Sequence, residues 1–489
     1  MKKEILILLL LLCCSVINVK SQTFNEAYND FKQKAQSDYE DFRKKANQEY
    51  ADWMKKAWEW HDKIEPMLLP KDEMLPPIIY NKEKEQKQEE PKPIPYEDIT
   101  PTPSPEPQPK PIAPIREDDG EYKKIEFQFF GTNGDVRLPK GSSFKIKGRN
   151  EEAFASAWEL LSSDQYNNLI RDCLVLRMKH QLCDWAYLQM LGIMSEAVCG
   201  KGTNEATMLQ AFVFCQSGYK IRLGLTKQKN LRLLFKSKHQ IFDLIGFKMQ
   251  DGLYYAIQSI DEEGLSICDV SYPEEMPLSL WISQEQLFAE KNSNERSLIP
   301  SDSIIVIKAR VNENLIKFFD TYPTSMINDD IVSRWAMYAN TPLSQKVKDK
   351  LYPQLRNIIS KADNKVMATE WLLYWVQTAF VYEYDDKVWG HDRAFFAEET
   401  LYYPYCDCED RSILFSRLVR DLLGLKVILV FYPGHLATAV DFNTPVNGDY
   451  INLNGRRFTI CDPTYIGAPI GVTMPDMDNK TAKVILLSQ

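Results

Sequence analysis

The 489-residue sequence has no long apolar run beyond its first residues, no excess of basic side chains and few cysteines. After residue 21 no stretch approaches the roughly 18 consecutive apolar residues of a membrane-spanning helix, so we expect no span in the mature chain. The 59 basic against 68 acidic residues give a formal net charge of −9, which argues against nucleic acid as a partner. Ten cysteines are too few for a disulfide-rich scaffold in so long a chain. The length indicates two or three domains, and a hydrophobic content of 44% indicates that most of the chain folds as globular protein.

The first 21 residues have the features of a secretory signal peptide. Two lysines precede the uninterrupted apolar stretch Ile5–Leu12, and Ser21 ends a small-x-small cleavage signal. We therefore expect an exported protein, either periplasmic or extracellular. A lipoprotein anchor at Cys13 or Cys14 is the less favoured alternative, because a lipidated cysteine should follow a small residue and Leu12 is large.

Aromatic residues recur every 11 residues near the N-terminus. Tyr28, Tyr39 and Tyr50 form one series, and a second aromatic series runs three residues behind it. A repeat of 11 corresponds to about 3.67 residues per turn, which predicts a nearly straight helix with one aromatic stripe. We expect this amphipathic helix over residues 22–64 to pack its stripe on the rest of the protein. Self-association through the stripe is the alternative.

Proline dominates the next segment. Ten prolines lie between Glu90 and Glu117, nearly alternating from Pro101 to Pro111. Proline fixes φ and lacks an N–H donor, so such a run holds neither a helix nor a sheet ladder. We expect residues 65–120 to form an extended linker that separates the amphipathic helix from the globular part.

The remaining chain contains two similar units, which we place at residues 121–300 and 301–489. In each, a predicted helix ends at a glycine and a strand follows, around Gly218 and Gly424. Further on, Ser266–Tyr272 matches Thr459–Tyr465. A histidine precedes the aspartate of each matched segment, by 30 residues for His239 and by 27 for His435. These ordered matches predict an internal duplication.

The second unit has clear local signals. Apolar spacing predicts a helix over residues 409–423 that Gly424 ends, with Cys408 at its start. Strands are predicted at 426–432 and 435–442, and Asn454-Gly455 predicts a hairpin turn before a strand that ends at Asp462. The cysteine, the histidine that opens a strand and the aspartate that ends one can supply a nucleophile, a base and an orienting carboxylate.

The thiol of Cys408 has opposing influences. Unpaired N–H groups at a helix N-terminus favour a thiolate. Glu409 and Asp410, which directly follow, oppose it. The polar and aromatic loop Trp389–Arg393 precedes the cysteine, and it is expected either to line a substrate cleft or to be a packed surface loop.

Three motifs of the second unit resemble those of the transglutaminase-like superfamily, within the papain-like group. They are Cys408-Glu409-Asp410, Pro433-Gly434-His435 and Asp462-Pro463-Thr464, and the resemblance covers roughly residues 365–470. It implies an α+β fold with Cys408 as nucleophile, His435 as general base and later acid, and Asp462 orienting the imidazole. The implied reaction is attack on a peptide or other amide, with a thioester intermediate resolved by water or an amine. No cofactor or metal is implied.

The sequence also departs from the family pattern. Cys406 replaces the glycine expected two residues before the nucleophile, and Gly202 stands at the nucleophile position of the first unit, which keeps His239 and Asp269. We therefore expect the first unit to be degenerate and non-catalytic, with His239 an ordinary partly buried residue.

Two alternatives to catalysis remain open. A binding or scaffold protein would retain the fold without the chemistry, and a redox protein would use Cys406 with Cys408. The oxyanion donor is equally open. The backbone N–H of Cys408 is one candidate, and Trp371, Gln377 and Trp389 are weak side-chain candidates.

Overall fold

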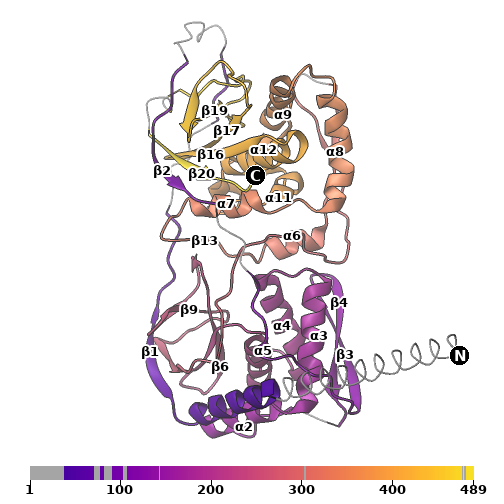
Figure 1. The fold of residues 1–489 in the computed structure, drawn as a ribbon, viewed down its shortest axis with the longest axis vertical. Helices are drawn as coiled ribbons and strands as arrows, with labels where there is room; N and C mark the ends of the chain where they lie inside the picture. Colours follow the sequence, from indigo (N-terminus) through magenta and orange to yellow (C-terminus); the bar gives the residue numbers. More distant parts are fainter. Residues whose placement is uncertain are drawn as a thin grey trace, which may run out of the picture.

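The computed structural model describes residues 38–70, 77–81, 91–102, 107–141, 144–301, 304–475, 477 and 481–489. The expected α+β class is confirmed: helices pack against a closed barrel in one half and a six-stranded sheet in the other. Figure 1 shows the second half above the first. The first half consists of residues 107–301 with residues 38–70, and the second consists of residues 304–489 with residues 77–102. The predicted signal peptide lies outside the described residues.

The N-terminal helix docks on the first half over residues 38–54. Tyr50 is buried with its ring 4.6 Å from that of Trp158, and Asn47 accepts a hydrogen bond from the Trp158 indole. Tyr39 of the first aromatic series and Trp53 of the second are about half exposed, at 52% and 51%. The stripe is therefore only partly used for packing, and helix-mediated self-association stays a prediction.

The helix does not extend to residue 64, so this part of the prediction was wrong. Residues Trp58–Ile64 form strand β1, which pairs with β10 (Gly264–Cys268) and β8 (Gly246–Met249) and closes the barrel. Strands β10 and β8 would otherwise have unpaired backbone groups along their edges, and β1 pairs with both of them. These long-range hydrogen bonds outweigh the local preference of residues 58–64 for a helix.

The proline-rich segment is extended as predicted, but it is not a spacer. Its described parts, which we call the strap (residues 91–102 and 107–120), lie against both halves. Strand β2 (Tyr96–Thr100) pairs in parallel with β20 (Ala482–Leu486) at the edge of the second sheet. Prolines beside an edge strand are tolerated, because its outer side has no neighbouring strand that needs their missing N–H groups. Farther along, Ile115 is buried in the core of the first half. Buried apolar side chains between the prolines explain the docking.

The first half combines a hairpin, four helices and the barrel. The barrel order is β1-β10-β5-β6-β9-β8. The other elements are η1 (Asp164–Tyr166), α2 (Glu151–Leu161), α3 (Asn167–Lys179), α4 (Asp184–Cys199), α5 (Asn204–Gln216), β3 (Tyr122–Phe129), β4 (Thr132–Pro139), β5 (Ile221–Leu225), β6 (Leu231–Lys236), β7 (Gln240–Ile241), β9 (Gly252–Ala256) and β11 (Arg296–Leu298). Strand β11 pairs with β12 (Ile307–Ala309), at the start of the second half.

The second half wraps helices around α12 (Cys408–Leu423), beside a sheet of order β18-β19-β17-β16-β20-β2. Its remaining elements are α6 (Glu313–Phe319), α7 (Ser333–Asn340), α8 (Gln345–Ile359), α9 (Lys365–Ala379), α10 (Asp385–Val388), α11 (Ala397–Tyr402), β13 (Ser325–Met326), β14 (Val381–Tyr382), β15 (Tyr405–Cys406), β16 (Lys426–Tyr432), β17 (His435–Asp441), β18 (Tyr450–Leu453) and β19 (Arg456–Cys461).

Helix α12 is the central element of the second half. Ile413, Leu414 and Leu418 are fully buried, and the helix packs against α7, α9, α11 and the strands β16 and β17. Gly424 ends it in the left-handed region at φ 60°, as a C-terminal glycine should. This packing fixes the start of the helix, and so the position of Cys408, against the sheet.

The predicted duplication is not confirmed. Both halves contain a helix followed by an antiparallel strand pair, α5–β5–β6 and α12–β16–β17. The strand that carries the matched aspartate, however, lies beside β5 in the first half and beside β17 in the second. Within the described residues, no helix combines the length and apolarity that crossing a bilayer requires.

Candidate active site

Cys408 is the first residue of α12 and is buried at the foot of a cavity. The preceding residue, Asp407, caps the helix together with Asp410. The Cys408 thiol donates to Oε2 of Glu409 over 3.2 Å, and the backbone N–H of Leu436 bonds to the sulfur from the neighbouring strand. Ser412 reinforces this junction, because its hydroxyl donates to the Leu436 carbonyl at 2.7 Å.

His435 and Asp462 form a buried pair at the same edge of the sheet. His435 opens β17, and Asp462 directly follows β19, which pairs with β17. Nε2 of His435 lies 2.8 Å from Oδ2 of Asp462, and both side chains are 2% exposed. The other carboxylate oxygen accepts from the N–H groups of Thr464 and Tyr465. These two backbone hydrogen bonds fix the orientation of the Asp462 carboxylate relative to the imidazole of His435.

A cavity of about 400 Å³ brings the predicted residues together. Cys408, Gly434, His435 and Leu436 form part of its wall, while Asp462 stands behind the imidazole. The three residues that the sequence predicted from separate motifs therefore meet at one site.

The thiol and the carboxylate of this site have opposite pKa shifts. Burial, followed by the charges of Glu409 and Asp407, raises the pKa of Cys408 well above its ordinary value, although the Leu436 N–H acts against this shift. Burial also opposes ionisation of Asp462, but His435 and the backbone donors lower the pKa of that carboxyl below its ordinary value. The site at rest therefore holds a neutral thiol and an ionised Asp462.

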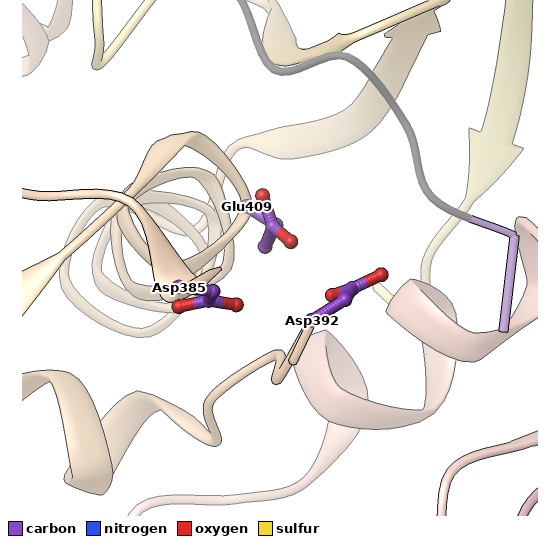
Figure 2. Close-up of side chains that lie close together, drawn as sticks. All are labelled: Asp385, Asp392 and Glu409. Atoms are coloured by element: carbon purple, nitrogen blue, oxygen red, sulfur yellow. The ribbon is translucent and has the colours of Figure 1, made fainter. Parts of the chain in front are cut away.

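An acidic wall faces the cysteine, and the sequence did not predict it. Asp385, Asp392 and Glu409 each bring a carboxylate oxygen within 4.8 Å of the others. Figure 2 shows the three side chains close together. Arg334 forms an ion pair with Asp392 at 2.9 Å. Burial and the charge of Glu409 raise the pKa of Asp385. The three carboxyls come from segments without a recognisable metal-binding spacing; only Asp392 lies in a loop that the sequence singled out.

The loop Trp389–Arg393 contributes only part of its length to the cavity. Asp392 lines the cavity, while Trp389 packs edge-on against Tyr403, with ring centroids 4.8 Å apart. Both expectations for the loop thus apply to different residues of it.

The other predicted residues take structural places. Gln377 is buried in α9, and its amide donates to the Asp462 carbonyl at 2.9 Å and positions that aspartate. Trp371 lines a different pocket, against α8. Cys406 and Cys408 are both free thiols, and the Cys406 thiol faces the carbonyl of Val381.

In the first half, His239 and Asp269 do not form a pair like that of His435 and Asp462. Asp269 binds the Nε of Arg222 at 2.7 Å, and His239 accepts a hydrogen bond from the N–H of Leu280 at 3.2 Å. Burial lowers the pKa of His239 to about 4. Gly202, at the position matching Cys408, lies in an exposed turn with φ 68°. His239 is more deeply buried than we expected.

No protein-family model matches the chain, and no curated protein or solved structure matches it either.

Proposed function

We propose that this protein is an exported cysteine hydrolase or acyltransferase of transglutaminase-like fold, acting on peptide or other amide bonds. The observation that carries the proposal is the 2.8 Å contact between His435 and Asp462, both buried, behind a cavity that Cys408 shares. A nucleophile, a base and an orienting carboxylate are the parts that covalent acyl transfer requires.

The protonation states assign the roles. Asp462 is ionised, so it accepts the Nε2–H of His435 and leaves Nδ1 as the basic nitrogen. His435 then takes the proton of Cys408 as the sulfur attacks the carbonyl carbon. The carbon–nitrogen bond breaks, the amine leaves with the proton from the imidazole, and a thioester remains. Water or a second amine, deprotonated by His435, releases the acyl group and restores the thiol.

The raised pKa of Cys408 determines when the thiol loses its proton in this reaction. A thiol that is neutral at rest is not a resident thiolate–imidazolium pair, so proton transfer to His435 must accompany attack. The backbone N–H of Cys408, at the start of α12, is the backbone candidate for the oxyanion donor, because the Leu436 N–H already bonds to the sulfur.

A binding or scaffold protein is the second candidate. The neutral, fully buried thiol supports it, because a binding protein has no need of an activated cysteine. This function would tolerate Cys408→Ser, whereas the catalytic one would not.

Acylation by a small activated ester tests the proposal. p-Nitrophenyl acetate should give a burst of nitrophenolate and an acetyl adduct that peptide mass mapping places on Cys408. Cys408→Ala should abolish both signals. Cys406→Ala, which removes a buried thiol two residues away, is the matched control and should retain them. An undiminished burst in Cys408→Ala would contradict the proposal, and a burst lost only in Cys406→Ala would identify Cys406 as the acylated thiol.

Export is part of the same proposal and has its own test. The apolar stretch Ile5–Leu12 and the site at Ser21 support it. The N-terminal sequence of the protein recovered from its native cells should begin at Gln22. A lipid-modified cysteine at the N-terminus would instead establish the anchored form.

A further inference from the structure

The acidic wall of the cavity has a geometry suited to a small cation. Asp385 begins α10, Asp392 lies in the following loop and Glu409 is the second residue of α12. Their carboxylates converge so that one oxygen from each lies within 4.8 Å of the others. Oxygens bound to a single Ca²⁺ at 2.3–2.6 Å are separated by about 3–5 Å, so one ion can reach all three.

A second observation points to the same ligand. Asp407 is 1% exposed, lines the same cavity, and its Oδ1 is buried without a hydrogen-bond partner among the described residues. A buried acceptor without a donor is costly, and a cation with its water shell would satisfy it. Asp407 is not one of the three converging residues, but its carboxyl contacts that of Glu409, so this buried acceptor adjoins the same wall and suits a positively charged occupant.

The charges around the wall favour a divalent ion. Four carboxylates, from Asp385, Asp392, Asp407 and Glu409, face one buried arginine, Arg334, which pairs with Asp392. At the rim, Asp386 and Lys387 also line the cavity, and Lys387 pairs with Glu383. When ionised, the four carboxylates exceed Arg334 by three charges, so a single ammonium group leaves more charge uncompensated than a divalent ion does.

We propose that Asp385, Asp392 and Glu409 bind one oxygen-preferring divalent cation, of the Ca²⁺, Mg²⁺ or Mn²⁺ class, beside Cys408. Carboxylate oxygens are the ligands these ions prefer, and the site has no contribution from sulfur or imidazole among its three converging groups. Asp407 contributes from behind, through its unpartnered oxygen or a bound water. Binding does not require turnover, so this inference stands or falls apart from the proposed acyl transfer.

Terbium luminescence provides a direct probe, because Trp335 and Tyr384 line the same cavity and can sensitise a bound Tb³⁺. In the full mature chain freed of metal by a chelator, we expect a saturable signal that Ca²⁺ or Mn²⁺ displaces. Calorimetry with each divalent ion alone should give one ion per chain, with a Kd on the order of 10⁻⁵–10⁻³ M.

Substitutions locate the ion. Glu409→Gln and Asp392→Asn should each weaken binding by about 10-fold or more, since each removes one charged ligand. Asp386→Asn, one residue from Asp385 but outside the three converging groups, is the matched control and should change the Kd by less than about 3-fold. Circular dichroism and melting in excess chelator establish that each variant is folded.

Several results would overturn the proposal. One is the absence of saturable binding to the wild-type chain at millimolar Ca²⁺, Mg²⁺ and Mn²⁺. Another is binding that Glu409→Gln and Asp385→Asn leave unchanged, or that Asp386→Asn removes. If Asp392→Asn fails to fold, the wild-type titration and Glu409→Gln still decide the question. Binding of an organic diamine in place of every metal ion would also contradict it.

Discussion

The two halves of the molecule place a histidine and an aspartate in the same order along the chain, yet only the second half joins them. His435 meets Asp462 at 2.8 Å, whereas Asp269 binds Arg222 and His239 faces the Leu280 N–H. The difference lies in strand order: β19 pairs with the histidine strand β17, while β10 pairs with β5. Matching spacing in sequence therefore does not by itself create a site; the neighbours of each strand decide it.

The halves also treat buried carboxyls differently. In the first half, Asp184 pairs with Arg177 at 2.9 Å and Glu275 with Arg222 at 3.0 Å. In the second half, Oδ1 of Asp407, which lines the cavity, has no hydrogen-bond partner among the described residues, and Glu398, outside the cavity, accepts from the backbone N–H of Ser344. Of these two carboxyls only Asp407 lines the cavity, and a buried acceptor without a donor at that place is better explained by function than by stability.

Replacing His435 or His239 by alanine should show the largest functional difference between the two halves. In His435→Ala, acylation of Cys408 by p-nitrophenyl acetate should slow by about 10²–10⁴-fold, because the general base is gone. His239→Ala, its counterpart, should acylate at the wild-type rate. Stopped-flow absorbance of the nitrophenolate burst measures both. Equal rates in the two variants would remove the distinction that the strand order creates.

Asparagine substitutions of the matched residues Asp462 and Asp269 should affect different properties, the acylation rate in one case and the stability in the other. Asp462→Asn should reduce the acylation rate by up to about 10⁴-fold, because an amide no longer holds the required imidazole tautomer. Asp269→Asn should leave that rate unchanged and lower the free energy of unfolding by roughly 1–3 kcal/mol through the lost bond to Arg222. Burst kinetics and urea denaturation of both variants test this. A stability loss without a rate loss in Asp462→Asn would make that aspartate structural too.

The buried carboxyls predict a pH dependence of stability. Burial raises the pKa of Glu398 from 4.5 to about 7, so its contribution to stability is complete below pH 4.5 and is lost as the pH rises through about 7. The loss amounts to roughly 3 kcal/mol. Glu398→Gln should flatten this fall, and Glu121→Gln, at an exposed glutamate, should not. Denaturation between pH 4.5 and 7.5 is the measurement, and an unchanged slope in Glu398→Gln would argue against the assignment.

Two glycines that end helices provide the smallest contrast. A Cβ on Gly424 meets nothing within 4 Å, so Gly424→Ala should cost about 1 kcal/mol, for the left-handed backbone alone. A Cβ on Gly218 collides with the backbone of Lys110 in the strap, so Gly218→Ala should cost more, about 2 kcal/mol or above. Thermal melting of both variants compares them. Equal losses would indicate that the strap does not press on the first half in solution.

Local signals predicted the second half well near its cysteine. The expected helix at 409–423 is α12 with one more residue, and Asn454-Gly455 forms the expected turn with both φ angles positive. The strand at 426–432 is β16, within the expected bounds. In each case, the determining interactions lie within a few residues of one another, so periodicity and turn chemistry were sufficient.

Long-range features could not be predicted in this way. Strands β1 and β2 exist because distant sheet edges accept them, and neither shows a strong pattern of its own. The acidic wall joins Asp385, Asp392 and Glu409 across a loop and a helix start, with no fixed spacing to detect. The buried role of Gln377 likewise depends on the segment around Asp462, 85 residues away.

The pairing of β2 with β20 has a consequence for how the protein is made. β20 lies between β16 and β2, and it emerges from the ribosome about 380 residues after β2. At 5–20 residues per second, β2 waits roughly 20–80 s for its partner. Until β20 has been synthesised, β2 and β16 each have an open edge that can mispair, so the second sheet cannot assemble before that strand is made.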